Sequence, residues 1–147
     1  SQAKWKLLEN FLEGLFDSIL WIEVVEKNMK NEDEEIDLVL KNNVQSPFFQ
    51  SLNSPVILVE AKNWAKPTPT KESRNFGMKC LTHKNLTRVW IFVAVNWFTD
   101  VHDDLQKRTW PMDYIEVLLD WSDIEDLLDN NIDPVNWLED KIIKSLK

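Results

Sequence analysis

The chain has 147 residues, enough for one domain with a hydrophobic core but too few for two domains of ordinary size. Hydrophobic residues make up 44% of it, with eight Trp, seven Phe and only two Gly, which indicates a globular protein and excludes long low-complexity segments. A single cysteine excludes an internal disulfide and a thiolate metal cluster, and no apolar run has the length of a membrane span. We therefore expect one domain over residues 1–147, located in the cytoplasm and without a membrane partner.

The formal net charge of −8 argues against a nucleic-acid partner when the chain is taken as a whole. The distribution of the charge changes that interpretation. Residues 61–99 contain seven Lys or Arg and one Glu, so this segment carries +6 and the other residues together carry −14. A local positive field can meet a phosphate backbone; the alternative is an ordinary solvated helix face.

Apolar periodicity and turn residues divide the chain into helices and strands. In chain order we expect a helix over 3–20, strands over 21–25 and 35–40 with an acidic turn between them, an irregular loop over 42–55, a strand over 56–62, a helix over 70–84, a strand over 88–95, a helix over 100–108, a strand over 114–119, and two helices that begin near 122 and 134. The order α-β-β-β-α-β, followed by α-β-α-α, predicts a mixed α/β protein with a central β-sheet flanked by helices.

Three details refine these expectations. Phe48 and Phe49 are expected to anchor the irregular loop to the core. Ser122 with an acid three residues later predicts a capping box. Asp133 followed by proline predicts the start of the last helix.

Charged residues stand on two neighbouring predicted strands. The aliphatic run over 56–59 is followed by Glu60 and Lys62, and the strand period of two places both side chains on one face. Asp37 lies near the start of the preceding strand, so pairing of the two strands would bring it beside Glu60. Two carboxylates and an ammonium predict a site for a divalent metal and a phosphate, and the alternative is a buried salt-bridge network of the same residues.

The first helix also carries two acids near its apolar stripe. Glu9 lies at the edge of that stripe, where it could face a cleft, and Glu13 lies farther toward the solvent side. From the helix alone, both are expected to be solvated.

With these residues in place, the sequence resembles the PD-(D/E)XK nuclease superfamily, and within it the restriction-endonuclease-like, Mrr-type branch. The resemblance lies in the element order and in the segments EIDLVL, which holds Asp37, and VEAKNW, which holds Glu60, Ala61 and Lys62. The segments NFGMK and WIFVAV and the closing residues 115–128 look similar too, so the resemblance covers nearly the whole chain. Two departures are that no proline precedes Asp37 and that the second acid is Glu where many members of this branch have Gln.

The resemblance implies a restriction-endonuclease-like core (αβββαβ) with a C-terminal αβαα extension, and Mg²⁺-dependent hydrolysis of DNA in which Mn²⁺ can substitute. By position, Asp37, Glu60 and the carbonyl of Ala61 would bind the metal, and Lys62 would serve the attacking water. Members of the family also have a glutamate on the first helix, which favours Glu9 over Glu13 as a further catalytic residue.

The basic segment supplies the candidates for contact with DNA. These are Lys66, Lys71, Arg74 and Lys79. Trp64 is a candidate for stacking on a base, with packing in the core or against a loop as the alternative. His83 and His102 lack the spacing of metal ligands, and Cys80 is expected in the core.

The leading hypothesis is a metal-dependent DNA endonuclease domain in restriction, defence or repair, with room for a homodimer and for a fused or partner recognition domain. One alternative is a catalytically inactive nuclease-fold module that binds nucleic acid or assembles with protein. The joint presence of Asp37, Glu60 and Lys62 disfavours it. Another alternative is a protein-interaction domain that uses the acidic C-terminal third.

Overall fold

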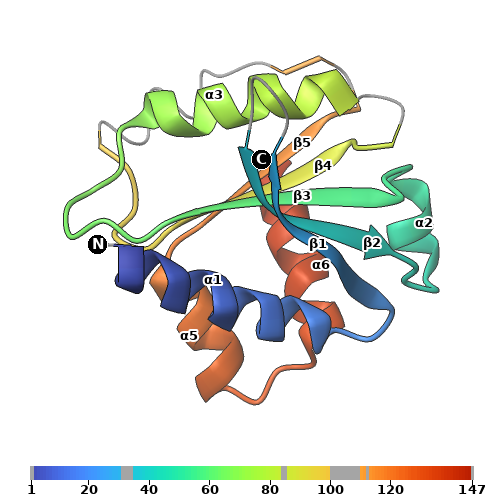
Figure 1. Ribbon diagram of the computed structural model, residues 1–147. Helices are drawn as coiled ribbons and strands as arrows, with labels where there is room; N and C mark the ends of the chain where they lie inside the picture. The colour runs from blue at the N-terminus through green and yellow to red at the C-terminus, as the bar shows by residue number, and fades with distance from the viewer. Residues whose placement is uncertain (1, 31–34, 84–85, 100–109, 112, 147) are drawn as a thin grey trace.

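The computed structural model describes residues 2–30, 35–83, 86–99, 110, 111 and 113–146. A five-stranded mixed sheet lies between helices (Figure 1). The strands, in their spatial order, are β1 (Ile22–Lys30), β2 (Glu35–Asn42), β3 (Val56–Lys62), β4 (Val89–Ala94) and β5 (Ile115–Leu119). The helices are α1 (Gln2–Asp17), α2 (Pro47–Ser51), α3 (Thr70–Cys80), α5 (Trp121–Asp129), α6 (Pro134–Ser145) and the 3₁₀ turn η1 (Leu81–His83).

Two hydrophobic clusters pack on opposite faces of the sheet. Helices α1, α5 and α6 cover one face, and α3 covers the other (Figure 1). Along β3, Ile57 and Val59 belong to the first cluster and Leu58 to the second, as strand alternation requires. All six residues of β4 are buried, which confirms the prediction of a central strand covered on both faces. The chain is therefore a mixed α/β protein.

The strand directions bring the charged residues at the start of β2 and at the end of β3 next to each other. β2 runs antiparallel to β1 and β3, whereas β3, β4 and β5 run parallel to one another. The start of β2 therefore lies beside the end of β3. Leu38 pairs with Val59, so the continued register places Asp37 next to Glu60, as the sequence predicted.

Several element boundaries differ from the predicted ones. β1 continues to Lys30 instead of ending at 25, because its pairing with β2 continues until Lys30 lies opposite Glu35. The predicted loop over 42–55 contains the short helix α2, whose N-cap is Ser46. The helices predicted to reach 20 and 84 end at Asp17 and Cys80. The predicted helix over 100–108 and the turn over 31–34 lie outside the described residues.

The predicted capping box was wrong by two residues. Asp120 accepts a hydrogen bond from the Asp123 backbone N–H at 3.1 Å, and its own N–H donates to the Asp123 carboxylate at 2.9 Å. Helix α5 begins at Trp121, so Ser122 lies inside the first turn and donates to Asp120 at 2.6 Å instead of capping the helix. At α6, by contrast, Asp133 is the N-cap and Pro134 the first residue, as predicted.

The predicted anchor of the loop is confirmed. Phe49 is buried in the cluster under α1, and Phe48 packs against that cluster. None of the described helices combines the length and apolar character needed to cross a membrane.

Candidate active site

Asp37 lies where the hydrogen-bond ladder between β2 and β3 ends. The last recorded pair is Leu38 with Val59, and beyond it the Asp37 Oδ2 atom accepts a hydrogen bond from the Ala61 N–H at 2.9 Å. The Asp37 side chain is 5% exposed. The Asp37 carboxylate thus pairs with the Ala61 N–H where the backbone ladder between β2 and β3 has ended. This bond fixes the position of the carboxylate.

Glu60 lies beside Asp37 and is 8% exposed. Burial raises the pKa of Glu60 to about 9, with further increases from the negative charge of Asp37 and from a hydrogen bond between the two side chains. The positive charges of Lys62 and Lys79 lower the pKa but do not reverse the shift. Without a cation, the two carboxyl groups therefore share this space with one of them protonated at neutral pH.

Lys62 and Lys79 bring positive charge to this pair from two elements. Lys62 follows Leu58 and Glu60 on the face of β3 that α3 covers, and its Nζ lies 5.8 Å from the centre of the Trp64 ring. Within the described part of the chain, Lys62 forms no ion pair with Asp37 or Glu60. The salt-bridge alternative requires such a pair, so the geometry favours a functional site over a closed structural network.

Lys79 differs from the other basic candidates in its burial. The sequence grouped it with the candidates for contact with phosphate and did not decide which of them face the cleft. In the structure it is half-buried on α3, and its charge acts on the Glu60 carboxyl group. Sequence reasoning missed this because only the packing of α3 over β3 shows which helix residues face the carboxylates.

The Asp37–Glu60 pair fits a hard divalent cation. Two buried carboxyl groups in hydrogen-bond contact repel once both are ionised, and a cation would offset this repulsion. The N–H and C=O of one strand residue point to the same neighbouring strand. Because the Ala61 N–H points to Asp37 on β2, the Ala61 carbonyl also faces β2. The three oxygen ligands implied by the resemblance thus belong to Asp37 on β2 and to two consecutive residues of β3, Glu60 and Ala61.

Glu9 makes its contacts elsewhere. Its side chain is buried, against the expectation of a solvated position, and its Oε1 accepts a hydrogen bond from Asn28 Nδ2 at 3.1 Å. Lys6 Nζ lies 3.4 Å from the same oxygen. Within the described residues, no three or more Asp, Glu, His or Cys side chains form a group that could hold a metal. Glu9 is thus not joined with Asp37 and Glu60 in one metal cluster.

Asn28 links Glu9 to the strand that carries Asp37. The neighbouring pairs Lys27 with Leu38 and Met29 with Ile36 place Asn28 opposite Asp37 in the β1–β2 ladder. Asn28 has a φ of 53°, in the left-handed region that asparagine tolerates better than most residues. An asparagine among the charged and apolar residues of β1 is the sequence signal for this contact. Glu13, in contrast, pairs with Lys27 at 3.5 Å near the surface.

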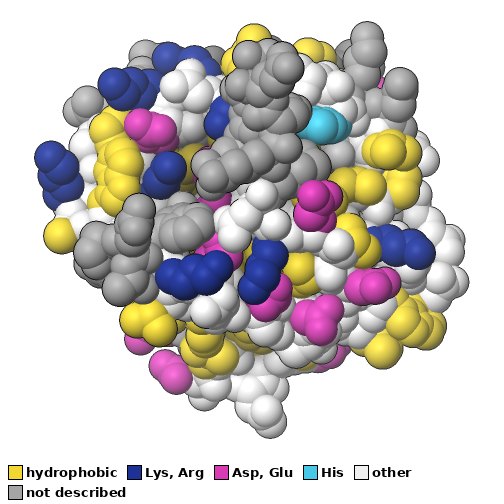
Figure 2. Space-filling model, viewed as in Figure 1, with side chains coloured by type: hydrophobic (Ala, Val, Ile, Leu, Met, Phe, Trp, Pro, Cys, Tyr) yellow, Lys and Arg dark blue, Asp and Glu magenta, His cyan; other side chains and the backbone are white. Residues whose placement is uncertain are grey.

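The other basic candidates are at the surface. Lys66, Lys71 and Arg74 are exposed, on the loop after β3 and on the first half of α3. Figure 2 shows Lys and Arg side chains gathered over this end of α3. This loop and the start of α3 directly follow the end of β3 along the chain.

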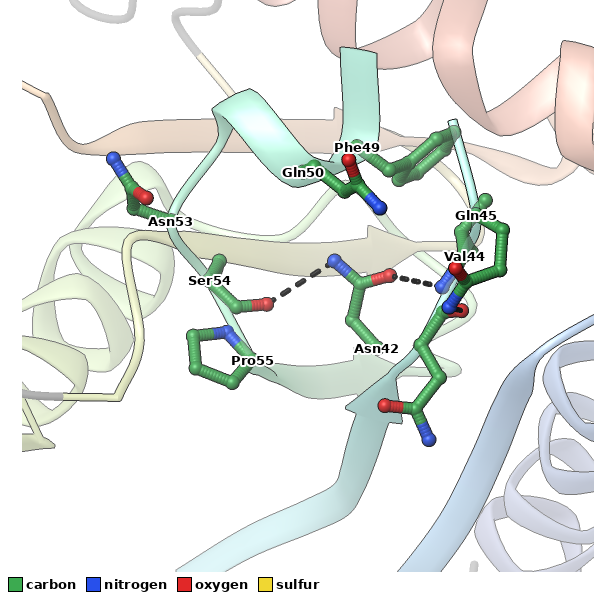
Figure 3. A pocket seen from close by; sticks show the side chains of 9 residues that line it. Asn42, Val44, Gln45, Phe49, Gln50, Asn53, Ser54 and Pro55 are labelled. Carbon is green, nitrogen blue, oxygen red and sulfur yellow. Dashed lines mark hydrogen bonds between the residues drawn. The ribbon is translucent and has the colours of Figure 1, made fainter. Parts of the chain in front are cut away.

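A pocket of about 280 Å³ lies at the other end of β3 (Figure 3). Its lining is uncharged and rich in carboxamide side chains: Asn42, Asn43, Val44, Gln45, Phe49, Gln50, Asn53, Ser54 and Pro55. Asn42 is occupied in the local fold, since its side chain donates to the Ser54 carbonyl and accepts from the Val44 N–H. The Ser54 hydroxyl likewise accepts from the N–H groups of Arg88 and Val89. With no acid, base or free nucleophile in its lining, this pocket is a weaker candidate for catalysis.

The remaining residues considered from the sequence add no second centre. Cys80 is fully buried in the cluster under α3, as expected for a core residue. His83 lies in η1, and His102 is outside the described residues. Comparisons with protein-family models, curated proteins and solved structures found no match to this chain.

Proposed function

We propose that the chain is a Mg²⁺-dependent nuclease domain that hydrolyses DNA phosphodiester bonds, with the restriction-endonuclease-like core that the resemblance implies. The observation that carries the proposal is the buried contact between Asp37 and Glu60 at the end of β3, with Lys62 on the same face and without an ion pair to either acid. A buried glutamate whose ionisation is opposed by burial and by a neighbouring acid is typical of a functional site, and a cation there would offset the repulsion. The neighbouring basic segment supports a polyanionic substrate.

Each residue has a distinct part in the proposed reaction. Asp37 and Glu60, with the Ala61 carbonyl, would hold the metal, which when bound polarises the phosphate and a water molecule as a Lewis acid. In hydrolysis the water oxygen forms a bond to phosphorus while the bond from phosphorus to the leaving sugar oxygen breaks. The water loses a proton and the leaving oxygen gains one. The Lys62 ammonium orients the water and stabilises the negative charge that develops on the phosphate oxygens.

The test is a plasmid-cleavage assay with Mg²⁺, with Mn²⁺ and with EDTA. We expect nicking or linearisation with either metal and none with EDTA. Lys62→Ala should abolish cleavage while leaving metal binding and thermal stability close to wild type, because it removes charge stabilisation and not a ligand. Lys144→Ala, which alters an exposed lysine of α6, is the control and should cleave like wild type. Wild-type rates in a folded Lys62→Ala protein would contradict the assignment. DNA binding without cleavage under every metal condition would support the inactive module instead.

A further inference from the structure

Trp64 is a large aromatic residue outside both hydrophobic clusters of the described residues. It belongs to neither cluster of buried residues and is not among the partly buried side chains packed against them. Trp90 and Trp137 are buried in these clusters, and Trp97, Trp110 and Trp121 pack against them. Among the described residues, packing in the two clusters therefore does not account for the half-buried position of Trp64.

The position of Trp64 is nevertheless defined by its neighbours. The Asn96 side chain, at the end of β4, donates a hydrogen bond to the Trp64 carbonyl. Lys62 Nζ lies 5.8 Å from the ring centre, within the range of a cation–π contact. Lys62 precedes Trp64 by two residues and the exposed Lys66 follows it by two. The indole thus lies beside the proposed catalytic lysine and within the basic segment.

We propose that Trp64 is a stacking platform for an unpaired nucleobase next to the phosphate that is cleaved. This inference rests on the proposed function and specifies its substrate. The base stacks on the exposed part of the indole, and the neighbouring phosphate is then within reach of Lys62, which lies 5.8 Å from the ring centre. Stacking on an aromatic side chain accepts every base, because each has a π face, so the platform adds affinity without selecting a sequence.

The platform has a consequence for the form of the DNA. Inside a duplex both faces of a base are covered by neighbouring bases, so an indole can stack only on a base that is unpaired or terminal. A nuclease that uses Trp64 in this way prefers single strands, overhangs or flaps to the paired interior of a duplex, and it would cut supercoiled plasmid where the strands open.

Binding measured in EDTA tests the inference without depending on cleavage. The probe is a fluorescein-labelled oligonucleotide, either single-stranded or as a blunt duplex of the same sequence, followed by fluorescence anisotropy. Trp64→Ala should weaken single-strand binding by roughly 5- to 150-fold, the loss of one stacked base, and weaken duplex binding much less. Trp64→Phe should restore most of the affinity. Trp21→Ala, at a tryptophan that is 49% exposed before β1, is the matched control and should bind like wild type.

Trp64→Leu keeps an apolar side chain without a π face and provides a second comparison if the alanine variant unfolds. It should bind single strands as weakly as Trp64→Ala. Equal losses on single strand and duplex, or a leucine variant that binds single strands like wild type, would overturn the platform while leaving the proposed nuclease intact. A wild-type protein that binds neither form of DNA would overturn both.

Discussion

Glu60 is buried, and its burial opposes the ionised form that binding of a metal would require. Its pKa is raised to about 9 from an ordinary value of 4.5, first by burial and then by Asp37. The carboxyl group is therefore protonated in the metal-free protein at neutral pH and must lose that proton to act as a metal ligand. Metal binding at this site is consequently coupled to proton release and should tighten as the pH rises toward 9.

The raised pKa predicts how the stability of the metal-free protein depends on pH. Folded Glu60 holds its proton up to about pH 9, whereas unfolded Glu60 loses it near 4.5. The stabilising contribution is thus complete below about 4.5 and is lost as the pH rises to 9, with a slope of at most about 1.4 kcal/mol per pH unit. Glu60→Gln should remove this slope. Urea unfolding in EDTA at a series of pH values measures it, and parallel pH profiles for the two proteins would contradict the prediction.

Asp37→Asn should separate the metal site from a structural ion-pair network. Asparagine keeps an oxygen that can accept the Ala61 N–H and removes the charge that opposes ionisation of Glu60. We expect the metal-free variant to be no less stable than wild type. Wild type should gain about 2.7 kcal/mol at a Mg²⁺ or Mn²⁺ concentration one hundred times its dissociation constant, and the variant should lose most of this gain.

Thermal melts with and without metal provide the measurement for Asp37→Asn. Asp140→Asn, at an exposed acid of α6, should respond to metal like wild type. A destabilised metal-free Asp37→Asn protein, together with a wild type that does not respond to metal, would show that the two acids serve the fold alone.

At the scale of elements, α3 connects the core to the site. Its buried side packs Phe76 and Cys80 against the sheet, and its Lys79 acts on Glu60. The close approach of Trp110 to α3 depends on Gly77, because a Cβ atom there would lie 2.3 Å from the Trp110 ring. A shift of α3 would therefore disturb both the packing of the sheet and the charge near the carboxylates.

Substitution by alanine should change the stability of the protein in opposite directions at its two glycines, Gly77 and Gly14. Gly77→Ala should destabilise the protein by about 1–3 kcal/mol, because the added methyl group overpacks the contact with Trp110. Gly14→Ala should stabilise it by about 0.4–1 kcal/mol, since the methyl group meets no atom within 4 Å and alanine favours the helix α1. Chemical denaturation of both variants tests this pair. Similar effects at the two positions would contradict the packing described for α3.

For the whole molecule, the distribution of charge matters more than its sum. The basic residues lie over one end of α3, while the chain as a whole carries −8. In the proposed function, such a surface would attract DNA to this end of α3 and repel it elsewhere. Electrostatic attraction of this kind is sensitive to salt.

Salt dependence of DNA binding should therefore report on the basic segment. Substitution by Ala of any two among Lys66, Lys71 and Arg74 should weaken binding and lower the slope of log K against log salt by about 1.4 to 1.8, since two phosphate contacts are lost. Pairs that include Lys79 should change the slope less, because this residue is half-buried near Glu60. Lys41→Ala with Lys144→Ala, both exposed lysines outside the segment, is the control pair. An unchanged slope in every pair would exclude the segment from the binding surface.

Local sequence determined the parts of this protein that depend on backbone periodicity. The period of two along β3 places Glu60 and Lys62 on one face, and the aliphatic runs identify the buried strands. The αβββαβ order was likewise predictable, apart from the short helix α2. Strand boundaries were less predictable, because pairing between β1 and β2 extends both strands through residues with weak local preference. The nuclease activity itself stays a prediction.

Only the tertiary structure decided what surrounds the two acids. Whether Glu9 is buried depends on how α1 packs against β1, and its partner Asn28 is 19 residues away. The rotation of α3 over the sheet decides whether Lys79 points to solvent or toward Glu60. The extent of the two hydrophobic clusters decides whether Trp64 is part of the core. Periodicity identifies the face of an element, whereas the neighbour that this face meets is set by the packing of segments far apart in the chain.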